Sequence, residues 1–137
     1  MRIGGVAIVT AAIALAGCSF GQDIASTGKA IDDFHASLNR DQIAIIYDGS
    51  NSDMKNATSA TDFSRFMTAI HTKLGAFKSG RSVGWNENAN PAGTFVVINY
   101  SAKYAKGDAA EVFTFKMAGG KPVLSGYNIN SRALIVN

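Results

Sequence analysis

The amino-acid sequence predicts an α+β fold in which N-terminal helices pack on one face of a curved four-stranded antiparallel sheet. Three observations lead to this fold class. Apolar residues recur at helical spacing up to Gly75, they alternate with polar residues after it, and short glycine-containing turns connect the alternating segments. Strands joined by such short turns run antiparallel, and the apolar face of their sheet needs a covering layer of helices.

Residues 1–17 precede the predicted domain and have the composition of a signal peptide. Arg2 is followed by an apolar stretch over residues 3–15, which is too short for a membrane span of about 20 apolar residues. Two small residues then lead to Cys18, the only cysteine of the chain. A single cysteine forms no internal disulfide and is a poor basis for a metal site, so a redox or metal role is not expected.

The order Leu15, Ala16, Gly17, Cys18 resembles the bacterial lipobox. The resemblance implies that diacylglycerol is attached to the thiol, that the signal peptide is removed before Cys18, and that the new amino group receives a fatty acid such as palmitate. Several acyl chains hold a protein stably on a membrane without any spanning helix. Ser19 stands where lipoproteins of the inner membrane carry Asp, so the resemblance implies the cell outer membrane, with the domain facing the periplasm.

Residues 18–29 are small and polar and are interpreted as a tether, and residues 30–137 as a single α+β domain. Ile31, Phe34 and Leu38 recur at helical spacing and predict a first helix over about residues 24–39. A second, short helix is predicted around residues 43–47. The segment DGSNSD, rich in turn-forming residues, ends it.

The third predicted helix has the clearest pattern in the chain. Thr61 is predicted as its N-cap, Asp62 lies at the positive end of the helix dipole, and Gly75 ends it. Apolar residues at helical spacing predict that one face is buried in the core: Phe63, Phe66, Met67, Ile70 and Leu74. Such a stripe is typical of packing and not of a cofactor site.

Strands are predicted over residues 81–87, 94–105, 110–117 and 122–131. In the second strand the alternation places Tyr100 and Tyr104 on an apolar face and Lys103 on a polar face. In the third it separates Phe113 from Lys116 in the same way. The sheet is therefore expected to turn one face to the helices and one to solvent.

The order of helices and strands resembles the cystatin-like superfamily in its nuclear transport factor 2-like form. The segments FHASLNRDQIAIIYDGS, DFSRFMTAIHTKLGAFKSG, VVINYSAKY, EVFTFKM and LSGYNINSRAL resemble small uncharacterised bacterial lipoproteins with such a cone-shaped domain. This resemblance covers about residues 30–134 and implies a fold, because that family has no agreed activity. The QxVxG loop of protease-inhibiting cystatins is absent from the sequence, so protease inhibition is not expected.

Aromatic side chains on the inner face are the candidates for a pocket, because the open end of a cone fold can be lined by such rings. His35 follows Asp32 at a helical spacing that suits acid–base chemistry. The competing interpretation is a histidine at the border of the core and tyrosines that only pack. The candidate pocket residues are His35, Tyr47, Trp85, Tyr100, Tyr104 and Tyr127.

The sequence motifs predict no catalytic residue, no metal ligand and no cofactor. The sequence contains none of the common nucleophile, zinc-protease, phosphate-binding or dinucleotide-binding motifs, and its two histidines have no cluster of Cys or acidic residues at ligand spacing. The absence of basic runs with interleaved aromatic residues argues against a nucleic-acid partner.

Charge is divided unevenly along the chain. Residues 18–62 contain three basic against seven acidic residues, and residues 63–137 contain nine basic against three acidic residues. Lys103 and Lys116 fall on the polar sheet face, with Lys106 in a neighbouring turn. These three lysines are a candidate basic patch for an anionic component of the envelope, and the alternative is an ordinary solvated surface.

Two hypotheses for function follow. The first is a lipid-anchored cell-envelope domain that binds a protein or another envelope component without catalysis. The second is a small-molecule binder or isomerase-like enzyme that uses a pocket inside the cone. A hollow interior with convergent polar groups favours the second hypothesis, and a filled interior favours the first.

Overall fold

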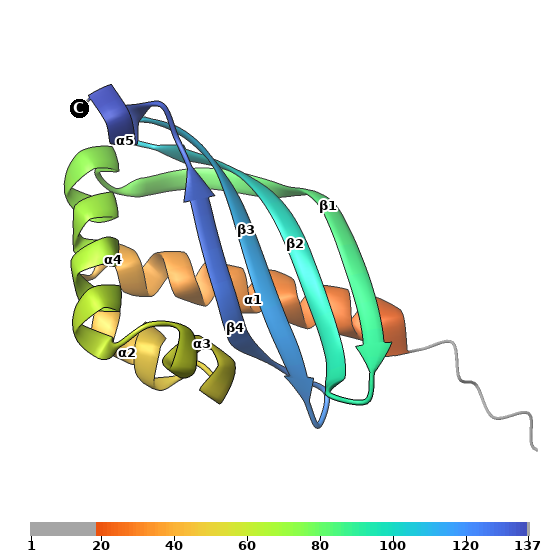
Figure 1. Ribbon diagram of the computed structural model, residues 1–137. Coiled ribbons are helices and arrows are strands. Elements are labelled where there is room, and N and C mark those ends of the chain that lie inside the picture. Colours follow the sequence, from red (N-terminus) through yellow and green to blue (C-terminus); the bar gives the residue numbers. More distant parts are fainter. Residues whose placement is uncertain (1–18, 137) are drawn as a thin grey trace, which may run out of the picture.

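The computed structural model describes residues 19–136, so the predicted signal peptide and Cys18 lie outside the described residues. Helices come first along the chain, strands follow, and a short helix ends the described part (Figure 1). The elements are α1 (Ser19–Asn39), α2 (Ile43–Asp48), α3 (Ser52–Ala57), α4 (Ala60–Leu74), β1 (Phe77–Asn90), β2 (Gly93–Tyr104), β3 (Gly107–Ala118), β4 (Lys121–Asn130) and α5 (Ala133–Val136). None of the helices in this described part has the length and hydropathy needed to span a membrane.

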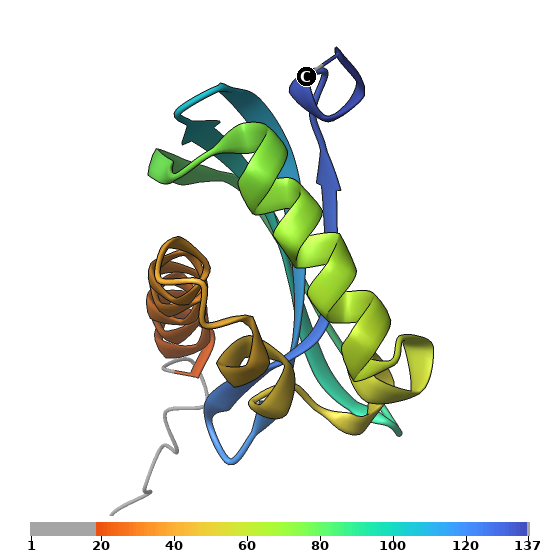
Figure 2. The same cartoon turned by 90° about the vertical axis from the view of Figure 1, so that its left-hand side faces the viewer.

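The four strands form one antiparallel sheet in the order β1-β2-β3-β4. The sheet is curved and does not close, and the helices gather on one side of it (Figure 2). The predicted α+β arrangement is therefore confirmed, and it is consistent with a cone-like fold.

The core lies between the helices and the inner face of the sheet. On β2 every second residue is buried, and the same holds for the central part of β3 around Phe113. The inward-facing residues of β2 are Val96, Ile98, Tyr100, Ala102 and Tyr104, which confirms the predicted faces of that strand.

Helix α4 supplies the opposite wall of the core, with two corrections to the sequence prediction. Its N-cap is Ser59 and not Thr61, because the Ser59 side chain accepts a hydrogen bond from the Asp62 amide at 3.1 Å. Phe66 is 44% exposed, so its predicted place in the core is wrong. The buried stripe of this helix is Phe63, Met67, Ile70 and Leu74, and Phe66 lies at its border.

Residues 19–29, predicted as a tether, form the first half of α1. Thr27 is fully buried, and its hydroxyl donates a hydrogen bond to the Ile24 carbonyl at 2.7 Å. Together with Ile31 these residues continue the apolar stripe of the helix by two turns toward its N-terminus. The prediction of a tether is therefore wrong, because the small polar residues of this segment belong to an amphipathic helix.

The structure also adds two helices that were not predicted, α3 and α5. The α3 helix begins within the segment read as a helix breaker, where the Asn51 side chain accepts a hydrogen bond from the Met54 amide and caps it. Strand β1 is longer than the predicted residues 81–87 because it pairs along almost the whole of β2.

Candidate functional site

The most unusual feature of the interior is a buried acid–imidazole pair. Nε2 of His35 on α1 lies 2.8 Å from Oε2 of Glu111 on β3. Both residues are only 1% exposed. An ionised carboxylate can only accept hydrogen bonds, so the imidazole Nε2–H is the donor in this pair.

Two tyrosines complete the coordination of the same carboxylate. The hydroxyls of Tyr104 on β2 and Tyr127 on β4 each donate to Oε1 of Glu111 at 2.6 Å. The four residues His35, Tyr104, Glu111 and Tyr127 are called the Glu111 cluster below. They connect α1 to three neighbouring strands, because each element contributes one side chain.

Both tyrosines are held in the protonated form. Burial raises the pKa of Tyr104 well above its usual range, and the negative charge of Glu111 raises it further. The pKa of Tyr127 is raised for the same two reasons, in the same order. The phenols therefore remain donors at neutral pH, and the buried carboxylate keeps all three hydrogen bonds.

Aromatic rings enclose His35 on several sides. Phe77 stacks on the imidazole with a centroid distance of 3.7 Å, and Tyr100 lies at 5.4 Å. Phe34 and Phe113 approach it edge-on at 5.5 and 5.7 Å. Nδ1 of His35 is buried and has no hydrogen-bond partner among residues 19–136. Rings and not solvent fill the space around the imidazole.

The structure brings four of the six candidate pocket residues together. His35, Tyr104 and Tyr127 belong to the Glu111 cluster, and Tyr100 packs beside His35. Asp32 is exposed, so it is not the acid partner that the helical spacing suggested for His35.

The other two candidates lie elsewhere. Tyr47 packs on Phe63 at a centroid distance of 5.4 Å and donates a hydrogen bond to the Thr58 carbonyl. Trp85 is 53% exposed on the edge strand β1. Neither of them contributes to the buried polar site, so the pocket predicted from all six residues does not form as one unit.

Glu111 is the site residue that sequence reasoning missed. It lies two positions before Phe113 on β3, so the alternation of the strand places it on the inward face. A charged residue at an inward position of an apolar strand needs buried partners. That signal was present in the sequence, but the partners come from three elements that only the tertiary fold brings together.

Three hollows in the surface reach neither His35 nor Glu111, although one of them is lined in part by Tyr127 of the Glu111 cluster. The largest of three, about 300 Å³, is lined by α1, α2 and the β3–β4 hairpin, and includes Phe34, Ile45 and Leu124. A second, about 280 Å³, lies between α3, α4 and β4 and includes Phe66 and Tyr127. The third, about 170 Å³, separates α1 from β1. All three are mostly apolar and partly open to solvent.

The three candidate patch lysines do not form one patch. Lys103 is paired with Asp108 across β2 and β3, and Lys116 is paired with Phe95. These two positions lie about 27 Å apart along the strand, given about 3.4 Å per residue. Lys106 lies near the Lys103 end, where its ammonium donates to the Thr72 carbonyl. Alternation correctly predicts that Lys103 and Lys116 lie on the same face of the sheet. The strand register places them at opposite ends of that face.

No group of three or more His, Cys, Asp or Glu side chains that could hold a metal ion is found between residues 19 and 136. His71, the other histidine, lies on α4, and its Nδ1 is buried without a partner in the same part of the chain. It has no acidic neighbour comparable to Glu111 among its described contacts.

A model of one protein family matches residues 31–127, which include the Glu111 cluster and most of the sheet. The chain belongs to the DUF4019 family. That family is described as one of proteins of unknown function. The DUF4019 match begins inside α1 and ends within β4, so it covers the four residues that meet at the buried carboxylate. No curated protein matches the chain.

Proposed function

We propose that this DUF4019 protein is a lipid-anchored domain of the cell envelope that acts by binding another envelope component, without catalysis. The anchor in this proposal is Cys18, and the location is the outer membrane facing the periplasm. The observation that carries the non-catalytic part is the filled interior. His35 and Glu111 are almost fully buried, and aromatic rings occupy the space where a substrate would have to lie.

The proposed role of the Glu111 cluster is structural. Its carboxylate accepts three hydrogen bonds from three different elements, so the buried charge is well satisfied. Such a network restrains α1 against the sheet, and both carboxylate oxygens of Glu111 have partners within it.

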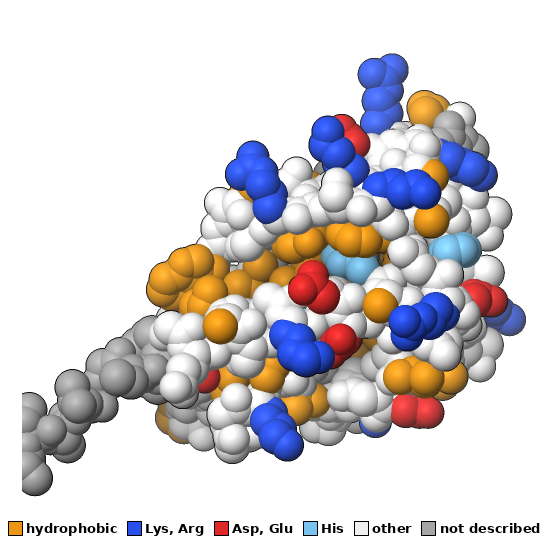
Figure 3. Space-filling model, turned by 180° about the vertical axis from the view of Figure 1, so that it is seen from behind, with side chains coloured by type: hydrophobic (Ala, Val, Ile, Leu, Met, Phe, Trp, Pro, Cys, Tyr) orange, Lys and Arg blue, Asp and Glu red, His pale blue; other side chains and the backbone are white. Residues whose placement is uncertain are grey.

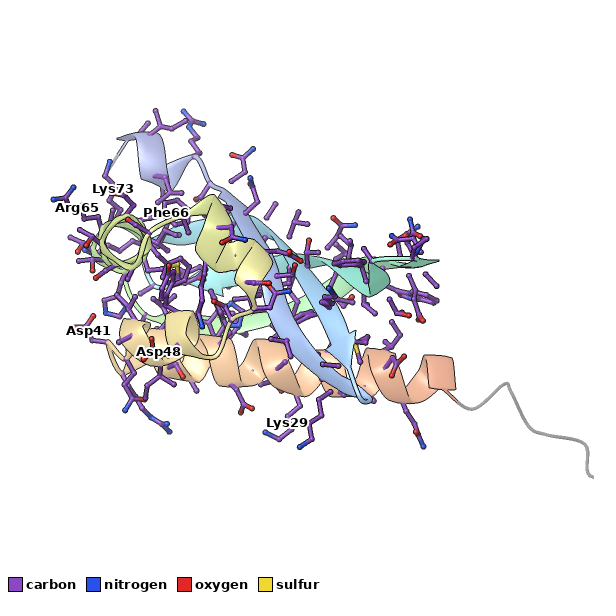
Figure 4. All side chains as sticks on the ribbon, turned by 60° about the horizontal axis from the view of Figure 1, so that its bottom comes forward. Lys29, Asp41, Asp48, Arg65, Phe66 and Lys73 are labelled. Carbon is purple, nitrogen blue, oxygen red and sulfur yellow. The ribbon has the colours of Figure 1, made fainter. Side chains whose placement is uncertain are left out.

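The binding surface in this proposal lies on the helix side of the molecule, where the two larger hollows open. Ile45 is 58% exposed at the 300 Å³ hollow, and Phe66 is 44% exposed at the 280 Å³ hollow. Figure 4 shows Phe66 on α4, away from the end at which α1 begins. Large apolar side chains that remain exposed beside apolar hollows are typical of protein-binding surfaces. An envelope protein is therefore the proposed partner, and an anionic component of the envelope is the second candidate.

Site-specific photocrosslinking in living cells tests this proposal. A photoreactive amino acid is placed at Ile45, at Phe66, or at Ser101 on the outer face of the sheet as a control. We expect a defined adduct from at least one of the first two positions and none from Ser101, identified by mass spectrometry. Equal capture from all three positions contradicts the proposal. The proposal is also contradicted if no position gives an adduct and a small molecule copurifies with the protein.

One observation favours the second candidate function, a small-molecule binder or isomerase-like enzyme. The buried Nδ1 of His35 has no partner in the described part of the chain, and a carboxylate and two phenols lie on the other side of the ring. Imidazole, carboxylate and phenol are the usual groups of acid–base catalysis. This function requires movement of Phe77 or Tyr100 away from the imidazole, and the copurified small molecule of the preceding test is its signature.

A further inference from the structure

Because no tether separates Cys18 from α1, the proposed lipid anchor would hold the start of α1 near the membrane. Helix α1 begins at Ser19, the residue that follows the proposed lipid anchor Cys18. An α-helix rises about 1.5 Å per residue, so Ile24 lies only about 7.5 Å along the helix from Ser19. The end of the molecule that carries the start of α1 must therefore lie close to the bilayer surface.

The edge strand β1 runs antiparallel to α1 and reaches the same end. At one end of the pair, the Asn39 side chain bonds the backbone N–H and C=O of Phe77 at 2.8 and 3.0 Å. Farther along, Ile24 and Thr27 of α1 face residues 80–82 of β1 across the 170 Å³ hollow. The following residues of β1 run on toward the end of the molecule at which α1 begins (Figures 1 and 4), although Figure 2 shows that they diverge from α1 itself.

This segment of β1, residues 82–90, carries an exposed apolar group and is called the β1 rim. Val83 is 55% exposed and Trp85 is 53% exposed. The only charged residue of the rim is Glu87, and the others are Gly, Ala, Ser or Asn besides these two. Figure 3 shows a large group of hydrophobic side chains at the end where the described chain begins. Few charges have to be desolvated when such a surface meets a membrane.

We infer that the β1 rim lies against the lipid headgroups and that Trp85 inserts at the membrane interface, fixing the orientation of the anchored domain. Tryptophan prefers the interface because its ring is apolar and its indole N–H can still reach a hydrogen-bond partner. The β3–β4 hairpin, with Lys116 and Lys121, lies at the same end of the sheet and offers positive charge to headgroup phosphates. This inference rests on the proposed anchor at Cys18.

The orientation also agrees with the proposed binding surface. Helix α4 and Phe66 lie at the end of the molecule opposite the start of α1 (Figures 1 and 4). With the β1 rim on the membrane, the hollow beside Phe66 stays accessible to a partner in the aqueous phase.

Trp85 is the only tryptophan of the chain, so its fluorescence reports this contact directly. The mature lipidated protein is reconstituted into phosphatidylcholine vesicles with or without brominated acyl chains, and quenching by aqueous iodide is measured in parallel. We expect a blue-shifted emission, loss of most of the emission with brominated lipid, and little quenching by iodide. A double variant, Trp85→Phe with Phe66→Trp, is the matched control, and its emission should respond to iodide and not to brominated lipid.

The outcomes separate this inference from the proposed function. Protein that is lipidated and bound to vesicles, but whose Trp85 responds only to iodide, overturns the inference and leaves the anchor intact. Wild-type protein that stays out of the vesicle fraction overturns both. Emission that is already blue-shifted without lipid, together with a dimer in solution, assigns the rim to a second copy of the chain and also overturns the inference.

Discussion

Replacing Glu111 with alanine is expected to lower the free energy of unfolding by about 3–5 kcal/mol, the usual cost of removing one partner from a buried charged pair. The change leaves the Nε2–H of His35 and the hydroxyls of Tyr104 and Tyr127 without their acceptor. A buried group that loses its hydrogen-bond partner costs about 1–3 kcal/mol, so three such losses make this one of the most damaging single substitutions in the chain. Urea unfolding followed by circular dichroism measures the effect.

Two further variants test whether the hydrogen bonds cause that loss. Glu111→Gln keeps the size of the side chain and an acceptor oxygen, so it should lose clearly less stability than the alanine variant. Asp32→Ala removes the same charge from an exposed position of α1 and should change stability by less than about 0.5 kcal/mol. If Glu111→Ala and Asp32→Ala unfold at the same urea concentration, the Glu111 cluster has no structural role.

The second large effect is expected in the core under α4. Ile70 is 1% exposed, and Ile70→Ala should lower the free energy of unfolding by about 2–5 kcal/mol, because it removes buried methyl groups and leaves a cavity. Chemical denaturation of the purified protein measures this loss.

Phe66 provides the matched control, one turn earlier on the same helix. Its ring is 44% exposed and touches the core only at its border, near Tyr127. Phe66→Ala should therefore cost only about 1 kcal/mol, roughly half of what full burial of a phenylalanine contributes. A loss for Phe66→Ala as large as that for Ile70→Ala means that the buried face of α4 has been assigned incorrectly.

The fold was predictable where periodicity is strong. Alternation on β2 placed Tyr100 and Tyr104 inward, because side chains of a strand point to opposite faces in turn. The stripe of α4 gave its buried face within one residue, and the error at Phe66 arises because a helical stripe has a border where burial is only partial. Local hydrophobic patterns therefore predict well which face of a helix or strand is buried.

Positions along an element and partners across elements could not be predicted in this way. Alternation put Lys103 and Lys116 on one face, but only the register of β2 and β3 shows that they lie far apart. The partner of His35 is 76 residues away in sequence, so helical spacing pointed to the wrong acid, Asp32. Long-range pairings depend on the tertiary fold.

The predicted tether failed for a different reason. Residues 19–29 contain Ser, Thr, Gly and Gln, which are common in linkers, and their composition outweighed the weaker helical pattern of Ile24, Thr27 and Ile31. Burial of Thr27 against the sheet side of α1 shows that a small polar residue can belong to the core when its hydroxyl bonds the preceding turn. The same correction places the start of the folded domain next to Cys18.

The most direct test of the proposed anchored domain is the mass of the N-terminal peptide of the mature protein, isolated from membranes and measured by mass spectrometry. We expect a peptide that begins at Cys18 and carries diacylglycerol on its sulfur and a fatty acid on its amino group. The Cys18→Ser variant is predicted to keep residues 1–17 and to carry no lipid. A mature protein that begins at another residue, or that carries an unmodified Cys18 thiol, would contradict the account.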